Sequence, residues 1–159
     1  MTIHCSPIGV VHSRFTESTG MPIQTAGAPD EPGRVEVFPE FAAGLRDIEG
    51  FEYLILLTHM HRCTNELLEV VPFLDTESHG VFATRAPARP NRIGMSIVRL
   101  QSVDGLMLHF TGNDMLDQTP ILDIKPYLPR FDVRSTGRVG WFASRLDQLP
   151  QVRSDDRME

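Results

Sequence analysis

Residues 79–100 read HGVFATRAPARPNRIGMSIVRL, and this stretch decides how the rest of the chain is organised. Two apolar runs, at 81–83 and 93–98, flank a centre that contains Pro87 and Pro90. Each proline fixes its own φ, lacks an N–H group and favours an extended conformation in the residue before it. The centre is therefore predicted to be a stiff extended loop, and not a helix.

Positive charge is concentrated on this loop. It carries Arg85, Arg89 and Arg92, and Arg99 follows in the next apolar segment. No Asp or Glu occurs in residues 78–103, although the chain has a net charge of −6. A guanidinium group presents planar N–H donors that match carboxylates and phosphates. The loop is either an anion-binding element or a solvated loop rich in proline and arginine.

Short β segments dominate the rest of the chain. Seven or eight of them can be counted, and the two on either side of Asp104-Gly105 form the clearest hairpin, for which a type I′ turn is predicted. Residues 51–57 are nearly all apolar and predict a central strand buried on both faces. The β and α segments do not alternate in units of about 30 residues, so a doubly wound sheet is disfavoured. We predict a mainly β fold: a single-domain β-barrel of short strands with one or two peripheral helices.

One helix is predicted after Pro39, which is suited to the first helical position. Phe41, Leu45 and Ile48 follow at spacings typical of an amphipathic helix, with Gly50 as a stop signal.

Composition excludes several classes of protein. The longest apolar run, residues 53–57, is far too short to span a bilayer, and the first residues do not resemble a secretion signal. Cys5 and Cys63 are expected to be reduced thiols in a cytoplasmic protein. With a sequence pI of about 5.5, indiscriminate binding of nucleic acid is not expected.

Histidine and cysteine residues also suggest a zinc site. His59 and His61 lie two residues apart at the end of an apolar run, and Cys63 and His79 are further candidates. No second pair has the spacing of zinc ligands, so no metal is predicted.

The central motif resembles the signature of the TsaA-like (TrmO) family of S-adenosylmethionine-dependent tRNA methyltransferases, in which ATR…RPNPIG…S is typical. The resemblance covers roughly residues 6–145 and includes PIGVVHS, GMPIQTAGA, VEVFPEFAAGLRDIEGF, LILLTHMHR, DMLDQTPILDIKPYLPRFD and RVGWF. It implies a β-barrel enzyme that methylates the exocyclic nitrogen of threonylcarbamoyladenosine next to the tRNA anticodon. It further implies tRNA as the partner and a homodimer with the cofactor site near the subunit interface. Arg92 departs from the usual Pro and Gln118 from the usual Gly.

The resemblance also implies a set of site residues. Those expected to contact S-adenosyl-L-methionine are Thr25, Ala26, Gly27, His61, Arg62, Arg85, Met95, Leu116, Asp117, Gln118 and Thr119. Those expected to contact the tRNA substrate are Arg89, Asn91 and Arg92. No catalytic residue is assigned, because no proton acceptor stands out from the sequence.

Two other functions stay open. Asp114 and Asp117, with Asp123 beyond them, offer carboxylates that could act as the acid/base pair of a hydrolase, although Asp is also common in turns. The chain could also be a non-catalytic S-adenosylmethionine-binding regulatory module. In either case we expect one domain over residues 1–146 and a disordered, charged tail over residues 147–159.

Overall fold

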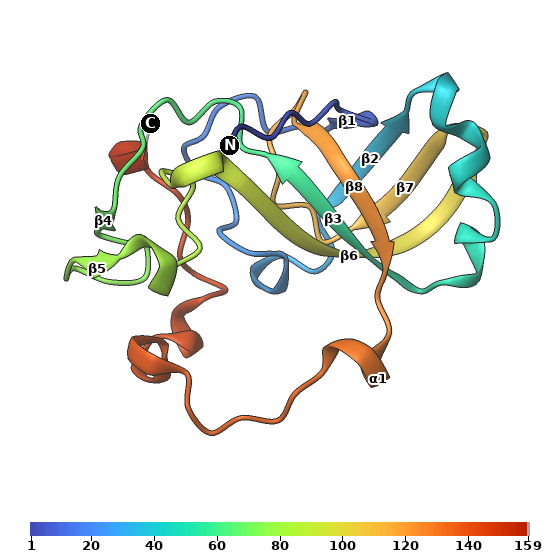
Figure 1. Ribbon diagram of the computed structural model, residues 1–159. Helices are drawn as coiled ribbons and strands as arrows, with labels where there is room; N and C mark the ends of the chain where they lie inside the picture. Colours follow the sequence, from blue (N-terminus) through green and yellow to red (C-terminus); the bar gives the residue numbers. More distant parts are fainter. Residues whose placement is uncertain (159) are drawn as a thin grey trace.

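The computed structural model describes residues 1–158, and within them six antiparallel strands close into a barrel (Figure 1). The order around the barrel is β1-β2-β7-β6-β3-β8. These strands are β1 (Gly9–His12), β2 (Pro32–Val37), β3 (Tyr53–His59), β6 (Ile93–Asp104), β7 (Met107–Thr111) and β8 (Pro120–Pro126). A separate two-stranded sheet consists of β4 (Glu69–Val70) and β5 (His79–Gly80). The predicted mainly β, barrel-like fold is confirmed.

The barrel core is built from residues that alternate along the strands. In β3, Leu54, Leu56 and Thr58 are buried, whereas Tyr53 is exposed and the residues between the buried ones are half-buried. The prediction of a strand buried on both faces was therefore wrong, because one face of this strand points away from the core. The buried core residues are Val11, Val35, Val37, Leu54, Leu56, Val98, Leu108, Phe110, Met115 and Ile121.

The predicted hairpin joins β6 and β7, but its turn differs from the prediction. Asp104 pairs with Met107, so the two turn residues are Gly105 and Leu106. Gly105 has φ +59°, and Leu106 has a negative φ. A positive φ at the first turn residue alone is the pattern of a type II′ turn, in which glycine takes that position.

Short 3-10 turns replace the longer helix that was predicted. The segment after Pro39 is the 3-10 helix η2 (Pro39–Leu45), in which the N–H of Phe41 donates to the carbonyl of Phe38. Leu45 and Ile48 pack against the barrel core, as the amphipathic pattern predicts. The other helices are η1 (Thr25–Gly27), η3 (Ile48–Gly50), η4 (Val81–Ala83), η5 (Pro90–Arg92), α1 (Pro129–Asp132), η6 (Gly140–Ser144), η7 (Leu146–Gln148) and η8 (Asp156–Met158). Over residues 1–158, every helix falls short of the length and apolarity that crossing a membrane requires.

A second, smaller apolar cluster lies beside the barrel, around β4 and β5. It consists of Cys63, Val70, Val81, Ala86 and Ala88, with Phe73 packed against it. Figure 1 shows the chain leaving the barrel after β8, passing through α1 and returning to this side of the molecule as the orange-to-red segment.

The expected disordered tail is not what the structure shows. Arg153 forms a β-bridge with Pro22, and the N–H of Ser154 donates to the carbonyl of Met21 at 3.0 Å. The guanidinium of Arg157 donates to the carbonyl of Pro72 and lies over the ring of Phe73. Backbone hydrogen bonds therefore hold the segment against the rest of the molecule. The charged composition of the segment does not reveal these bonds, because they do not depend on side-chain type. The division between residues 146 and 147 stays a prediction.

Candidate cofactor and substrate site

A cavity of about 870 Å³ lies between the barrel and the smaller apolar cluster. Its wall is formed by the segment 21–26, the neighbouring ends of β3 and β6, the segments 60–63 and 72–74, the proline-rich loop 82–91, and the returning segment 139–155. After β7, residues 114–116 and Thr119 also line it. Segments that are far apart in the sequence therefore converge on a single cavity.

The proline-rich loop is held by hydrogen bonds to backbone groups, within the loop and at Cys63. The hydroxyl of Thr84 donates to the carbonyl of Val81 at 2.8 Å and accepts from the N–H of Ala86 at 3.2 Å. The guanidinium of Arg89 donates to the carbonyl of Thr84 at 2.9 Å, and that of Arg92 donates to the carbonyl of Cys63 at 2.6 Å. These two arginines therefore brace the loop through backbone carbonyls.

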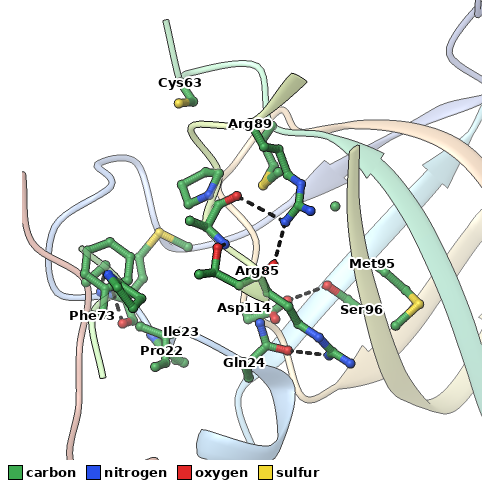
Figure 2. A pocket seen from close by; sticks show the side chains of 18 of the residues that line it. Pro22, Ile23, Gln24, Cys63, Phe73, Arg85, Arg89, Met95, Ser96 and Asp114 are labelled. Atoms are coloured by element: carbon green, nitrogen blue, oxygen red, sulfur yellow. Dashed lines mark hydrogen bonds between the residues drawn. The ribbon is translucent and has the colours of Figure 1, made fainter. Parts of the chain in front are cut away.

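Arg85 is placed differently from the other two arginines. Its side chain is exposed at the cavity, and Nη1 donates to Oε1 of Gln24 at 2.9 Å (Figure 2). This bond joins the proline-rich loop to the segment 21–26 at the cavity wall. Because Gln24 is neutral, the positive charge of Arg85 remains available to an anion.

Asp114 and Ser96 lie together in the wall of the cavity (Figure 2). Ser96 is a buried residue of β6, and its hydroxyl donates to Oδ1 of Asp114 at 2.6 Å. Burial raises the pKa of Asp114 to about 6, although the hydrogen bond from Ser96 and the charge of Arg85 act in the opposite direction. Asp114 is absent from the set of site residues expected from the sequence.

His61 contributes an unpaired polar atom to the cavity wall. Among the described residues, its Nδ1 is the buried side-chain nitrogen or oxygen that has no hydrogen-bond partner. Burial, with smaller contributions from Arg62 and His59, lowers the pKa of His61, so the ring is neutral at neutral pH. A buried polar atom without a partner is a natural contact for a ligand.

The loop 113–119 is fixed from beneath by Asn113, which is fully buried. Its amide donates to the hydroxyl of Ser13 at 2.8 Å and accepts from the N–H of Met115. Asp117 accepts from the N–H of Ser13 at 3.0 Å, and Gln118 is exposed. Asp117 and Gln118 therefore shape the loop from outside the cavity, in the manner of turn residues.

The predicted site residues divide into two groups. Those that line the cavity are Ala26, His61, Arg62, Arg85, Met95, Leu116, Thr119, Arg89 and Asn91. Those that the structure does not bring to its wall are Thr25, Gly27, Asp117, Gln118 and Arg92. Sequence reasoning missed Ser96, Phe82 and the wall formed by the C-terminal segment. It considered Asp114 only as a carboxylate of a possible hydrolase, and it included Gln24 only as part of the motif GMPIQTAGA.

The C-terminal wall is anchored through Trp141. Its indole stacks on the ring of His79 with centroids 4.5 Å apart, and its Nε1 donates to the carbonyl of Ala83 at 2.9 Å. His79 and Arg145 both contact the carboxylate of Asp75 at 3.0 Å. These contacts, led by the hydrogen bond from His79, lower the pKa of Asp75 to about 2. The RVGWF motif was recognised in the sequence, but its position against this loop depends on the fold.

The two departures from the family pattern lie at unusual backbone positions. Arg92 has φ +50° and Gln118 has φ +62°. Proline cannot adopt a positive φ, so Arg92 gives this turn a conformation that the usual residue would not allow. Glycine suits the position of Gln118, because a left-handed conformation is strained for other residues.

Replacing Gln118 with glycine is expected to stabilise the protein by up to about 1 kcal/mol. The substitution removes the strain of a left-handed non-glycine residue, and this gain exceeds the free-energy cost of the greater entropy that glycine gives the unfolded chain. Chemical denaturation measures this difference. Gln118→Ala is the matched control and should not stabilise, since alanine keeps the strain. A Gln118→Gly protein less stable than Gln118→Ala would contradict the prediction.

Comparison with known proteins agrees with this geometry. Residues 10–133 match the family described as the tRNA-methyltransferase O N-terminal domain. The chain belongs to this family. The TrmO crystal structure from Pseudomonas aeruginosa superposes with a TM-score of 0.74 and is 38% identical in sequence. It matches 89% of the present chain, which spans 63% of the crystallised chain.

Relatives of this chain differ in how specifically they are named. A protein of Pyrococcus abyssi, named "Probable S-adenosyl-L-methionine-binding protein", is 52% identical over 95% of this chain and 82% of its own length. A mouse protein named "tRNA (adenine(37)-N6)-methyltransferase" is 35% identical over 90% of this chain and 38% of its own length. The chain thus spans less than two thirds of the crystallised TrmO and of the mouse enzyme. The C-terminal wall, residues 139–155, lies beyond the family match.

Proposed function

We propose that this chain binds S-adenosyl-L-methionine in the cavity and methylates the exocyclic nitrogen of threonylcarbamoyladenosine next to the anticodon of tRNA. The observation that carries the proposal is the convergence of separated family motifs on one cavity. Ala26, His61, Arg85 and Leu116 come from four different segments, and all four line its wall. The names of the Pyrococcus and mouse relatives support the cofactor and the substrate class respectively.

The residues of the cavity fit the chemical groups of this cofactor. Arg85 offers a guanidinium to the carboxylate of its methionine part, and the unpaired Nδ1 of His61 offers a polar contact. Leu116, Trp141 and Leu149 provide apolar and aromatic surface for the adenine ring. When bound, the cofactor supplies an electrophilic methyl group, so the chain's main task is to position the two reactants.

The surroundings of the cavity support a nucleic-acid substrate. Phe82 lines the cavity with 74% of its surface exposed, and an unstacked base of a tRNA loop can stack on such a ring. Arg89 and Asn91 line the same cavity. Positive charge is therefore available for the anticodon-loop phosphates or for the threonyl carboxylate, although the whole chain is acidic.

We expect Arg89 and Arg92 to add to tRNA binding in addition to bracing the loop, because each guanidinium has five donors and only some are used internally. Replacing either with alanine should lower the slope of log affinity against log salt by about 0.7–0.9 for each phosphate that the variant no longer neutralises. Filter binding over a salt series measures this slope. Arg99→Ala is the matched control, since Arg99 is paired with Glu52 on the barrel surface. Wild-type slopes in both loop variants would show that the loop does not contact RNA phosphates.

We also propose that the protein acts as a cytoplasmic homodimer. Residues 129–140 are exposed throughout, and within them Phe131 and Val133 expose 67% and 56% of their surface. Figure 1 shows this segment extending away from the barrel. We expect a second copy of the chain to cover it. Sedimentation of the wild type and of Phe131→Glu tests the assembly, and a monomeric wild type would refute it.

Nucleoside mass spectrometry tests the proposed reaction. Purified protein, tRNA that carries threonylcarbamoyladenosine and the cofactor should yield a nucleoside heavier by one methyl group. The second candidate, a regulatory module that binds the cofactor without turnover, is favoured by the naming of the Pyrococcus relative as a binding protein. Calorimetric binding without methylation would support that candidate, and the absence of both would exclude the two together.

A further inference from the structure

The inference rests on the proposed function and concerns the fate of a proton. The exocyclic nitrogen of the proposed substrate carries one hydrogen, and its lone pair is delocalised into the purine and the carbamoyl group. A new bond to carbon leaves this nitrogen positively charged unless the hydrogen departs as a proton. A well-placed acceptor typically accelerates such a step by about 10²–10⁴-fold.

Two carboxylates line the cavity among the described residues, Asp114 and Asp155. Asp155 is already neutralised, because Arg157 holds it with Nε at 2.8 Å from Oδ1 and Nη2 at 2.6 Å from Oδ2. Asp114 receives a hydroxyl hydrogen bond from Ser96. The guanidinium of Arg85, whose charge acts on Asp114, donates to Gln24 instead. Asp114 is thus the cavity carboxylate that keeps basic character.

Asp114 is held in position both by its neighbour in the sequence, Asn113, and by its hydrogen-bond partner, Ser96. It follows Asn113, which is fully buried and bonded to Ser13, so the backbone cannot shift freely. Ser96 lies on β6 opposite Leu56 of β3, inside the barrel wall. One carboxylate oxygen is therefore fixed by the barrel, and the carboxylate stands in the cavity wall (Figure 2).

The electrostatic surroundings suit a proton acceptor. Burial raises the pKa of Asp114 to about 6, and it is opposed by the hydrogen bonds from Ser96 and the backbone of Thr25 and by the charge of Arg85. At neutral pH the group is then mostly ionised and yet more basic than an exposed carboxylate. His61, another titratable group in the cavity wall, has its pKa lowered by burial.

We infer that Asp114, oriented by Ser96, accepts the proton of the exocyclic nitrogen during methyl transfer. The nitrogen forms its bond to the methyl carbon while the carbon–sulfur bond breaks, and that electron pair stays on sulfur as a neutral thioether. The electron pair of the N–H bond stays on nitrogen, and the proton moves to a carboxylate oxygen of Asp114. The proton then passes to water after the product leaves. Ser96 is a positioning residue in this scheme.

The test is a single-turnover methylation assay at saturating cofactor and tRNA, from pH 5 to pH 9, with the Asp114→Asn protein. We expect the rate at pH 7.5 to fall by about 10²–10³-fold while cofactor affinity, measured by calorimetry, changes less than about threefold. The wild-type rate should fall as the pH drops through about 6, and the variant should lose this limb. Glu52→Gln, an exposed carboxylate paired with Arg99, is the matched control.

Ser96→Ala provides a second variant that keeps the carboxylate. The hydrogen bond from Ser96 lowers the pKa of Asp114, so its loss should move the acidic limb of the rate profile to higher pH. A purely structural role of Ser96 would leave the limb where it is. Carbon-13 NMR titration of the Asp114 carboxyl gives the same shift without any turnover.

The outcomes separate the inference from the proposed function. If the wild type methylates no tRNA, the proposed function fails and this role falls with it. If the wild type is active and Asp114→Asn keeps its rate, the inference alone is overturned. It is also overturned if Asp114→Asn loses cofactor affinity tenfold but keeps the rate at saturation, because Asp114 then binds the cofactor.

Discussion

Replacing Arg85 with alanine is expected to weaken S-adenosyl-L-methionine binding by about tenfold to hundredfold while the fold is retained. A hydrogen bond that involves a charged group contributes about 1.5–3 kcal/mol, and Arg85 is the exposed guanidinium of the proline-rich loop that faces the cavity with a neutral partner. The variant also removes the positive charge that lowers the pKa of Asp114. Isothermal calorimetry measures the affinity, and circular dichroism reports on the barrel.

Two comparisons make this result specific. Gln24→Ala removes the partner of Arg85 without removing the charge, so a smaller loss is expected from it. Arg99→Ala removes a surface guanidinium of β6 that is paired with Glu52, and it should leave the affinity unchanged. If a folded Arg85→Ala protein keeps wild-type affinity, Arg85 does not hold the cofactor.

Deleting residues 147–159 is expected to lower cofactor affinity by at least about tenfold and to leave the barrel folded. The deletion removes Leu149, Ser154 and Asp155 from the cavity wall, and burial of one leucine contributes about 1.5–3 kcal/mol. It also removes the backbone bonds that Ser154 makes with Gly20 and Met21. The barrel core lies in a separate cluster, so far-ultraviolet circular dichroism should change little.

The matched control is a deletion of residues 1–6 at the other end of the chain, all of which are exposed. It should change neither the affinity nor the melting temperature. Ser154→Pro is a milder variant that removes both the N–H donated to Met21 and the hydroxyl donated to Ser18. Wild-type affinity in the 147–159 deletion would mean that the segment is the dispensable tail expected from its composition.

Strand pattern and turn chemistry made the barrel predictable. Alternating apolar residues and a glycine at the β6–β7 turn are local features, and local features are visible in a sequence. The helix after Pro39 was harder, because its apolar spacing fits an α-helix. The segment instead forms 3-10 turns, with Gly44 among them and Asp47 in a left-handed conformation. From these turns, only Leu45 and Ile48 pack against the barrel core.

The site could be predicted only where a motif residue both faces the cavity and belongs to a recognised stretch. Arg85 and His61 meet both conditions. Asp117 belongs to a recognised stretch but bonds to Ser13, which lies far earlier in the chain. Asp114 stands just before it in the sequence and looks equally suited to a turn. What distinguishes Asp114 is its raised pKa and its hydrogen bond from Ser96. Both depend on burial, which only the closed barrel provides.

Because residues 139–155 form one wall of the cavity, the cavity is completed only at the end of synthesis. All six barrel strands lie between Gly9 and Pro126, so they leave the ribosome before the segment that bonds to Gly20 and Met21. Chains fold from the N-terminal side as they emerge. The barrel strands are therefore complete while one side of the cavity is still missing. A nascent chain paused at this point would expose the apolar lining around Phe73, which Arg157 covers in the finished molecule.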